Sequence, residues 1–562
     1  MESRESSGLT LFGRKEAPMR RLMMVAVTLV VLWGAALNAQ EAQARKVDRV
    51  FAEYAKPGSP GCAVGVIRDS SFIYRKGYGM GSVELGVALS PKSVFYMGSV
   101  SKQFTAAAVV LAQEQGYLKL DDNVRKYVPE IPDYGYTITL REMMLHTSGF
   151  RDFLSLFALA GRDVGGIHLR AEIIDVIARQ KGLNNVPGEA WLYSNTNYYL
   201  LGVVIERATK TSLNEFAAEN IFKPLGMTHT RFYDDHTLVL PGRVAAYDPG
   251  KDGKFLVDWS TSYDIVGAGG LMSTVDDLLL WDRNFYENKL GKGTLVKELQ
   301  TKGMLNDGKQ ISYALGLEIE SYRGLRTVEH DGGLYGYRTN ILRFPDQQFT
   351  AVCLCNLSNA NPHDLSRRIA DIYLDAKLHA VTSEPATPNG KGFPDANQFA
   401  GKYLDSRKHF TYTFSAADGQ LMAWGAKLSR VGPNQFRDLG TGTITFEGSG
   451  ADMKATLEMD GKAFFAGQRI EPPQLSATEL AAYKGDYRSA ELEATYTLKV
   501  EQGKLTLRNG WNPAQNLTSL TKDEFESEEY GTIVFRRDAN GKVNGFSVNT
   551  VEARDIDFDK TK

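Results

Sequence analysis

The chain has 562 residues, of which 43% are hydrophobic and 23% charged, and its formal net charge is -2. It is too long for one compact domain and leaves room for two or three, each with its own core. The near-neutral balance of charge argues against nucleic acid as a partner. The eight histidines show no ligand spacing such as HExxH, so the sequence predicts no metal site.

The first 44 residues are typical of a secretory leader. Arg20 and Arg21 precede an apolar run over residues 22–37, and the chain turns polar at Gln40. The run is short for a membrane span, which favours a signal peptide over an uncleaved anchor. We therefore expect an exported protein, either periplasmic or secreted.

Three cysteines are present, Cys62, Cys353 and Cys355, and each lies in an apolar run typical of a strand. Three cysteines do not make a disulfide framework. Cys353 and Cys355 point to the same face of one strand and are badly placed to bond each other. We expect buried free thiols that act as small apolar side chains, while a bridge from Cys62 in an oxidising compartment stays open.

The rest of the chain divides into a mixed body and an all-β remainder. Residues 45–381 combine helices with strands, including strands over residues 62–68 and 71–77. Residues 382–394 are rich in Pro, Ser, Thr, Asn and Gly, as in a linker. Beyond them, short alternating runs broken by Asp-Gly, Gln-Gly and Asn-Gly turns predict antiparallel β-structure.

The β region also repeats itself. Two elements recur: FAGKY at 399–403 returns as YKGDY at 483–487, and Gly-Thr-Ile at 442–444 returns at 531–533, each time six residues after a phenylalanine, Phe436 or Phe525. We predict two small barrel-like modules, at residues 395–471 and 472–562. The modules either cover apolar surface or mediate dimerisation, or a loop from one of them reaches a cleft in the mixed body and limits which molecules enter it.

The first chemical motif is Ser99-Val-Ser-Lys102, which opens an Ala-rich helical run. Positions three apart share one helix face, so the Ser99 hydroxyl and the Lys102 amine can lie side by side. A serine hydroxyl is a weak nucleophile until a base removes its proton, and a lysine becomes that base where desolvation lowers its pKa. The helix N-terminus adds positive potential where an oxyanion would form. Spacing alone is not decisive, because Ser519-Leu-Thr-Lys522 matches it within the β region.

Two further motifs supply the remaining groups. Tyr193-Ser-Asn195 precedes a helical run; a phenol can relay protons to a leaving group, and an Asn side chain can hold a substrate amide. His330-Asp-Gly332 leads into Gly333, a glycine-dense stretch suited to a strand edge that lies close to a substrate.

SxxK, YxN and HxG in this order resemble the serine β-lactamase and D-alanyl-D-alanine peptidase superfamily, in particular its class C-like branch. Three further segments are similar to that branch: LHTSG at 145–149, PLGM at 224–227 and AGGLMST at 268–274. The resemblance implies an α+β catalytic domain of the β-lactamase/transpeptidase type, with an active site between a helical lobe and an antiparallel sheet flanked by helices. The two all-β repeats are similar to the layout of D-aminopeptidases in that superfamily.

The resemblance also implies residue roles. Ser99 would be acylated, Lys102 would activate it, and Tyr193 would act as base and then as acid. The backbone N–H groups of Ser99 and Gly333 would form the oxyanion hole. Water would release the acyl group, so no cofactor is expected. The substrate-binding residues would be Asn195, His330, Gly332 and Gly333.

His330 departs from the KTG motif usual in dedicated class C β-lactamases, because it replaces the lysine. A histidine near its ordinary pKa offers a less dependable positive charge for a substrate carboxylate. That shifts the expectation from β-lactam hydrolysis toward peptidase or esterase work. Arg338 could supply a permanent charge instead, and His146 is expected to pack and hydrogen-bond.

The sequence therefore predicts an exported serine hydrolase that cleaves an amide or ester in a small molecule or short peptide, with D-residue peptides or esters as substrates. One alternative is a penicillin-binding carboxypeptidase or weak β-lactamase. Another, from a different class, is a non-catalytic receptor for peptidoglycan fragments. Assembly into a homo-oligomer is left open.

Overall fold

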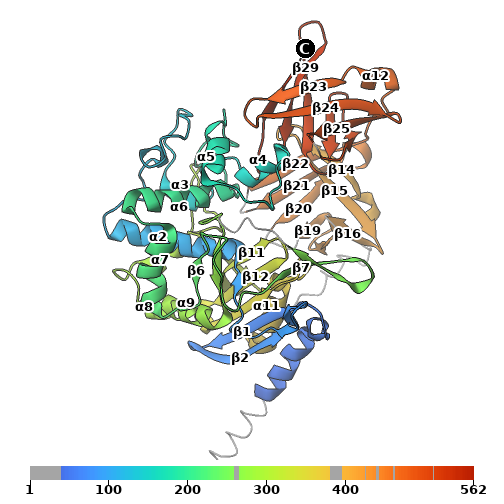
Figure 1. Ribbon diagram of the computed structural model, residues 1–562. Helices are drawn as coiled ribbons and strands as arrows, with labels where there is room; N and C mark the ends of the chain where they lie inside the picture. Colours follow the sequence, from blue (N-terminus) through green and yellow to red (C-terminus); the bar gives the residue numbers. More distant parts are fainter. Residues whose placement is uncertain are drawn as a thin grey trace, which may run out of the picture.

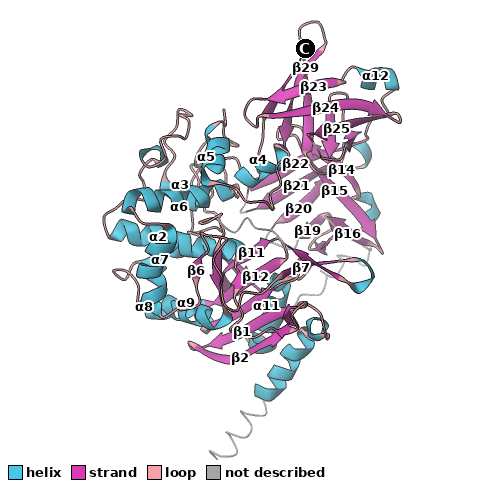
Figure 2. Ribbon diagram, viewed as in Figure 1, coloured by secondary structure: helices cyan, strands magenta, loops and turns pink. Residues whose placement is uncertain are grey.

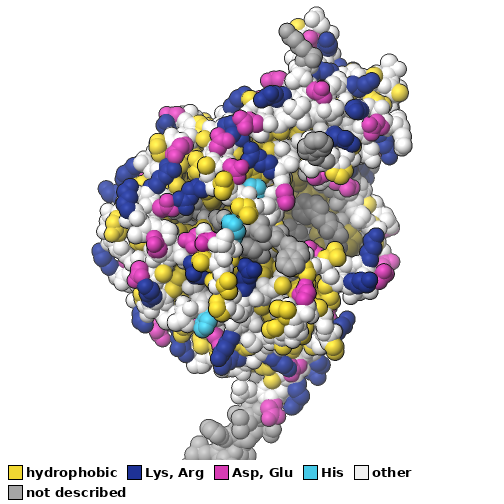
Figure 3. All heavy atoms as spheres, viewed as in Figure 1, with side chains coloured by type: hydrophobic (Ala, Val, Ile, Leu, Met, Phe, Trp, Pro, Cys, Tyr) yellow, Lys and Arg dark blue, Asp and Glu magenta, His cyan; other side chains and the backbone are white. Residues whose placement is uncertain are grey.

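The computed structural model describes residues 40–258, 265–379, 395–423, 426–437, 442–459, 462–510 and 512–561. All but the last five residues of the predicted leader, and the whole predicted linker at 382–394, lie outside the described residues. Within the described ranges, no helix combines the length and the apolarity needed to cross a membrane. On the face shown in Figure 3, basic and acidic side chains are interspersed over the surface.

The centre of the catalytic domain is a six-stranded sheet. Two of its strands come from the beginning of the domain and four from its end. Its order is β10-β11-β12-β13-β1-β2, and every neighbouring pair is antiparallel. The predicted strands at 62–68 and 71–77 are present, the second one residue longer. The bounds are β1 (Cys62–Arg68), β2 (Ser71–Tyr78), β10 (Glu318–Tyr322), β11 (Leu325–Leu334), β12 (Tyr337–Phe344) and β13 (Phe349–Cys355).

Both faces of this sheet are covered, which explains why β1 is apolar from Cys62 to Ile67. Successive residues of a strand point to opposite faces. Val64 and Val66 pack in the cluster formed with the N-terminal helix at residues 40–50 and with α11 (Pro362–Leu374). Ala63 and Ile67 belong instead to the cluster that contains α9 (Val275–Glu287) and the helical lobe.

The helical lobe lies beside the sheet, as Figure 2 shows. At its centre α2 (Ser101–Glu114) is buried from residue 101 to 112 and packs against α6 (Asn195–Thr209). Alanines at 106–108 combine high helix propensity with a small side chain, so they let the two helices approach closely. The other helices are α3 (Leu140–Met144), α4 (Phe153–Leu159), α5 (Arg170–Ala178), α7 (Leu213–Ala217), α8 (Lys223–Leu225) and α10 (Leu295–Leu299).

Short strands connect the lobe to the sheet. A three-stranded sheet, β5-β9-β6, holds the segment before Ser99 against the segment after Gly270. The bounds of the short strands are β3 (Met80–Ser82), β4 (Val87–Ala88), β5 (Phe95–Tyr96), β6 (Arg231–Phe232), β7 (Ala246–Pro249), β8 (Phe255–Asp258) and β9 (Leu271–Ser273).

The expectation of three free thiols is wrong for two of them. Cys62 on β1 and Cys355 on β13 are register partners and form a disulfide, while Cys353 is free and buried. The alternative left open for Cys62 is therefore the one that the structure has. The pairing depends on β1 lying next to β13, and that neighbour is set by sheet topology rather than by cysteine spacing.

The all-β remainder forms two separate modules, as predicted, drawn in orange and red in Figure 1. The first is a nine-stranded sheet of order β17-β16-β15-β14-β22-β21-β20-β19-β18, and the second is a closed barrel of eight strands, β23 to β30. The first contains β14 (Gly401–Asp405), β15 (Phe410–Ala417), β16 (Gln420–Ala423), β17 (Ala426–Lys427), β18 (Ser429–Arg430), β19 (Gln435–Arg437), β20 (Thr443–Glu447), β21 (Lys454–Met459) and β22 (Lys462–Ile470). The second contains β23 (Gly485–Ser489), β24 (Ala494–Glu501), β25 (Lys504–Asn509), β26 (Gln515–Ser519), β27 (Glu524–Ser527), β28 (Gly531–Arg537), β29 (Val543–Asn549) and β30 (Ile556–Lys560), besides α12 (Ala477–Ala481) before the barrel.

The sequence repeat corresponds to a repeated hydrogen bond. The Tyr403 hydroxyl donates to the Phe399 carbonyl at 2.9 Å, and the Tyr487 hydroxyl donates to the Tyr483 carbonyl at 2.8 Å. Both tyrosines are fully buried, so each bond satisfies a hydroxyl inside an apolar core. The two modules therefore share the same local construction at their first strand.

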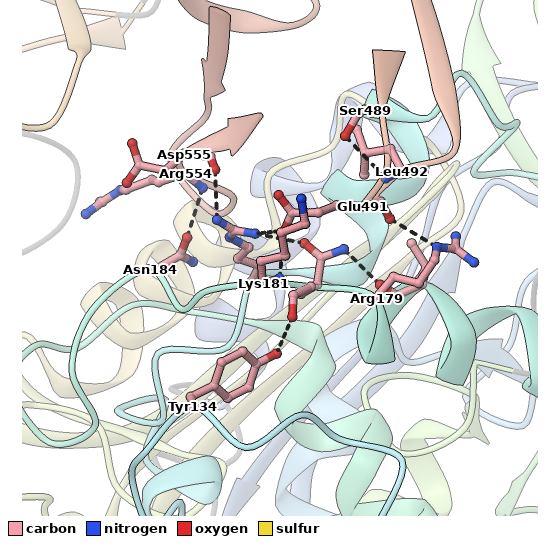
Figure 4. A network of polar contacts seen from close by, with 12 residues as sticks. Tyr134, Arg179, Lys181, Asn184, Ser489, Glu491, Leu492, Arg554 and Asp555 are labelled. Atoms are coloured by element: carbon pink, nitrogen blue, oxygen red, sulfur yellow. Dashed lines mark hydrogen bonds and ion pairs between the residues drawn. The ribbon is translucent and has the colours of Figure 1, made fainter. Parts of the chain in front are cut away.

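The two modules differ in how they meet the catalytic domain. The first has an apolar core of its own, whereas the core of the second is continuous with that of the helical lobe. At this contact the Tyr496 hydroxyl and the Asn509 amide both donate to the Leu159 carbonyl at the end of α4. Figure 4 shows the polar side of the contact, where Glu491 lies among groups of the lobe. The second barrel thus packs on the catalytic domain through a shared apolar core.

Candidate active site

The structure brings the first two motifs together around one hydroxyl. Ser99 lies on a 3-10 turn, Gly98–Val100, directly before α2, and Lys102 lies in the first turn of that helix. The Lys102 amine donates to Ser99 Oγ at 3.0 Å, and the Tyr193 hydroxyl donates to the same oxygen at 2.7 Å. Ser519, in the segment with the same spacing, lies on a barrel strand and donates to a carbonyl instead.

Lys102 is buried with three acceptors around its amine. Besides Ser99 Oγ, the amine reaches Asn195 Oδ1 at 2.9 Å and the Ala268 carbonyl at 2.8 Å. Burial lowers the pKa of Lys102 to about 7, although the carboxylates of Asp152 and Glu552 act in the opposite direction. A neutral amine has two N–H donors, enough for Asn195 and Ala268, and its lone pair would then face Ser99.

Tyr193 is held in the protonated state that donates to Ser99. Burial raises the pKa of its phenol well above the ordinary value. Its ring packs on His146 with centroids 4.3 Å apart, and His146 Nδ1 accepts a hydrogen bond from the Ser194 N–H at 3.1 Å. Burial also lowers the pKa of His146 well below its ordinary value, so this ring is neutral. His146 therefore supports Tyr193 by packing and hydrogen bonding.

The third motif lies on β11 and approaches the serine turn through glycines. A Cβ on Gly332 would lie 2.1 Å from the Met97 carbonyl, and a Cβ on Gly98 would lie 2.6 Å from the Gly333 nitrogen. Side chains at these positions would push the turn and the strand apart. The Gly333 N–H is thereby kept beside the serine turn, where an oxyanion donor is needed.

His330 is more deeply buried than its predicted role suggests. Its Nδ1 lies 2.6 Å from the Asp331 carbonyl oxygen. Because a carbonyl oxygen can only accept a hydrogen bond, Nδ1 carries the ring proton. Nε2 therefore accepts a hydrogen bond from the Tyr313 hydroxyl, at 2.9 Å. Burial, together with the charge of Lys102, lowers the pKa of His330 to about 3. This neutral ring supplies no cation to a substrate. Arg338 is the register partner of Gly333 on β12 and carries a permanent charge there.

The catalytic cavity has a volume of about 210 Å³. Ser99, Tyr193, Asn195 and Gly333 line it together, with Lys102 bonded to two of them, while His330 and Gly332 do not line it. The remaining lining residues are mostly apolar: Tyr96, Gly98, Leu154, Ile265, Ala268, Gly269 and Leu334. The substrate-binding roles of His330 and Gly332 stay predictions, and the structure places both residues behind the cavity wall.

Two carboxyl groups outside the three sequence motifs adjoin this site. Asp152 caps α4 and accepts from the Asn195 N–H through Oδ2. Glu552, on a loop of the second barrel, accepts from the Ser155 hydroxyl at 3.1 Å, and its carbonyl accepts from the Asp152 N–H at 3.0 Å. Burial raises the pKa of both carboxyls, that of Glu552 to about 7.

A module loop thus reaches the wall behind Asn195, although Glu552 is not among the residues that line the cavity. The sequence signal nearest to Asp152 is the LHTSG segment at 145–149, which ends three residues before it. No sequence signal marks Glu552, which is 400 residues from Asp152.

The described residues include no group of three or more His, Cys, Asp or Glu side chains that could hold a metal ion. The serine, lysine and tyrosine can together perform acyl transfer: one group attacks, one accepts a proton and one donates a proton.

Comparison with known proteins agrees with this chemistry. A family model described as Beta-lactamase matches residues 47–375. Penicillin-binding protein 4* of Bacillus subtilis (strain 168) is 30% identical over 352 residues, 59% of this chain and 76% of that protein. The D-aminopeptidase of Brucella anthropi is 25% identical over 524 residues, 89% of this chain and 95% of that protein.

Among solved structures, the octameric penicillin-binding protein homologue from Pyrococcus abyssi aligns with a TM-score of 0.54 at 21% identity, covering 84% of this chain and 99% of that one. At this identity the likeness supports the fold alone. The family model, in contrast, spans more than half of the chain and includes all three motifs. The chain belongs to the β-lactamase family and is a serine hydrolase.

Proposed function

We propose that the protein is an exported hydrolase that cleaves the amide bond of small D-amino-acid peptides or amides, or the corresponding esters, through an acyl-Ser99 intermediate. The observation that carries the proposal is the position of Ser99 Oγ, within hydrogen-bond distance of both the Lys102 amine and the Tyr193 phenol. That arrangement supplies a nucleophile with separate groups to accept and to donate a proton.

The pKa shifts support one order of proton transfers. Lys102, whose pKa is lowered to about 7, accepts the Ser99 proton while Oγ attacks the substrate carbonyl. The phenol of Tyr193, whose pKa is raised, stays protonated and delivers its proton to the leaving amine or alkoxide. The proton held by Lys102 then restores the phenol, and water releases the acyl group from Ser99. These directions favour Lys102 over Tyr193 as the first base.

The backbone N–H groups of Ser99 and Gly333 would stabilise the oxyanion. Losing one such donor typically costs about 10²–10³ in rate. Asn195 has both a carbonyl and an amide to hold a substrate amide, and its carbonyl is oriented by Lys102. Leu154, Ile265 and Leu334 form apolar walls suited to an aliphatic side chain.

Two observations support D-amino-acid substrates over β-lactams. The alignment with the D-aminopeptidase of Brucella anthropi covers 89% of this chain, so it extends well beyond the catalytic domain into the β modules. The neutral His330 also removes the charge that a KTG lysine would offer to the carboxylate of a β-lactam. A penicillin-binding carboxypeptidase is the second candidate, favoured by the 30% identity to penicillin-binding protein 4*.

The first test is hydrolysis of a nitrophenyl butyrate by the full-length protein and by its Ser99→Ala variant. Ser519→Ala is the matched control, because Ser519 heads a segment of the same spacing outside the site. We expect Ser99→Ala to lower kcat by about 10³-fold or more, and Ser519→Ala to leave it unchanged. Equal turnover by the wild type and Ser99→Ala would exclude the acyl-serine mechanism and leave the receptor hypothesis.

The second test compares nitroanilides of D-alanine and L-alanine with a chromogenic cephalosporin. Faster turnover of the D-anilide supports the peptidase assignment, whereas slow release of the bound cephalosporin from Ser99 supports the carboxypeptidase. Export is tested by the N-terminal sequence of the mature chain from the cell exterior or periplasm. Homo-oligomerisation, left open by the sequence, is tested by light scattering.

A further inference from the structure

A second cavity lies where three parts of the chain meet. Its volume is about 500 Å³, more than twice that of the catalytic cavity, and within the range of roughly 300–1,000 Å³ usual for small-molecule sites. The segment at residues 184–192 forms one wall, the first module a second, and Arg554 on a loop of the second barrel a third. It shares no lining residue with the catalytic cavity.

Most of the wall is apolar. Side chains from the lobe and from the first module face the same space: Val186, Trp191, Leu192, Leu305, Ile311, Met459 and Phe464. A cavity with this lining would favour an apolar molecule of a size that fills it.

The apolar wall also carries two cations. The Arg554 guanidinium has no hydrogen-bond or ion-pair partner among the described residues, although the Arg554 backbone N–H is fixed by Asn184 Oδ1 at 2.9 Å. Figure 4 shows the Arg554 side chain extending away from the neighbouring polar network. The Lys408 amine donates to the Phe464 carbonyl at 2.6 Å and to the Ala463 carbonyl at 3.3 Å, which leaves one N–H for a ligand.

The two cations act on the same space. Burial lowers the pKa of Lys408, and the charge of Arg554 is the next largest cause in the same direction. Burial also lowers the pKa of Arg554, but a guanidinium remains charged. Carboxylates nearby act in the opposite direction and offset part of this charge: Asp405 raises the pKa of Lys408, and Asp555 and Asp405 raise that of Arg554. An anion in the cavity would relieve both the desolvation and the mutual repulsion.

We propose that this cavity binds small organic carboxylates with an apolar body, such as arylalkanoates. The planar carboxylate would take two parallel hydrogen bonds from the Arg554 fork and one from Lys408. The apolar body would pack on Trp191 and Phe464. A free phosphate fits less well, because it would leave the apolar wall in contact with water.

The site adjoins the catalytic machinery through its first wall. Trp191 packs edge-on against His146, with ring centroids 6.4 Å apart, and the Leu192 N–H donates to the His146 carbonyl at 2.9 Å. His146 in turn lies under Tyr193. A bound carboxylate would therefore restrict the segment that positions Tyr193 without entering the catalytic cavity.

The test is calorimetric titration of the full-length protein with 4-phenylbutanoate and with its uncharged amide. We expect the carboxylate to bind at least about tenfold more tightly than the amide. Arg554→Gln should remove this preference, and Arg554→Lys should keep part of it, which separates the charge from any effect on folding. Arg488→Gln, at an exposed position in the same barrel, is the matched control and should bind as the wild type does.

Three results would overturn the proposal. The first is no binding of 4-phenylbutanoate at about 10 mM, a concentration that should saturate even a weak site. The second is a loss of the preference for the acid: the wild type binds acid and amide with equal affinity, or Arg554→Gln prefers the acid as strongly as Arg488→Gln does. The third is competitive inhibition of ester hydrolysis with an inhibition constant equal to the Kd, because that would place the ligand at Ser99.

Discussion

The ion pair between Arg151 and Glu491 should be the strongest polar contact between the helical lobe and the second barrel. The Arg151 Nη1 to Glu491 Oε2 distance is 2.6 Å, and the two side chains are only 3% and 2% exposed. Breaking a buried pair by removing one charge costs about 3–5 kcal/mol, because the other charge stays buried. In Glu491→Gln, Arg151 keeps two acceptors, Gln180 Oε1 at 3.1 Å and the Asp555 carbonyl at 3.0 Å. We therefore expect the free energy of opening this contact to fall by about 3 kcal/mol, the lower end of that range.

Because the chain has several domains, one global unfolding free energy is not well defined. The assay is native-state hydrogen exchange of amides at residues 485–489 and 549–555, which reports the opening of the barrel contact itself. Asp559→Asn is the control, since its pair with Arg536 in the same barrel is 82% and 39% exposed and should contribute no more than about 1 kcal/mol. If Glu491→Gln increases exchange no more than Asp559→Asn does, the ion pair does not hold the barrel and the reasoning fails.

Three further predictions concern the catalytic site. The kcat/KM for an uncharged ester should rise with pH through about 7, because Lys102, with a pKa of about 7, must lose its proton to act as base; a pH-independent rate between 5 and 9 would contradict this. Glu552→Gln should move that rise to lower pH, since the Glu552 carboxylate raises the pKa of Lys102. An unshifted pH profile would show that Glu552 does not act on Lys102. Gly332→Ala should lower kcat by about 10²-fold with an unchanged circular dichroism spectrum, because its Cβ would meet the Met97 carbonyl at 2.1 Å. Gly166→Ala, where the nearest atom is 3.3 Å from the new Cβ, is the control and should be fully active.

The sequence was most informative where the chemistry depends on neighbours along the chain. The spacing of Ser99 and Lys102 on one helical turn predicts their contact, and the family was identified from three such local motifs. The β repeats were also visible, because each module builds its first strand around a tyrosine in the same local pattern. The mixed catalytic domain and the two β modules were therefore predicted correctly.

Contacts between distant segments required the tertiary structure. The Cys62–Cys355 disulfide exists because β1 and β13 are neighbours in the sheet, which no cysteine spacing indicates. The neutral state of His330 follows from burial behind the cavity, whereas the sequence led us to expect a histidine near its ordinary pKa. Glu552 reaches Asp152 only because the core of the second barrel is continuous with that of the helical lobe. Local residue patterns thus identified the groups that we propose to perform the chemistry, and packing between segments far apart in the chain decided their charge states, because desolvation depends on everything that surrounds a group.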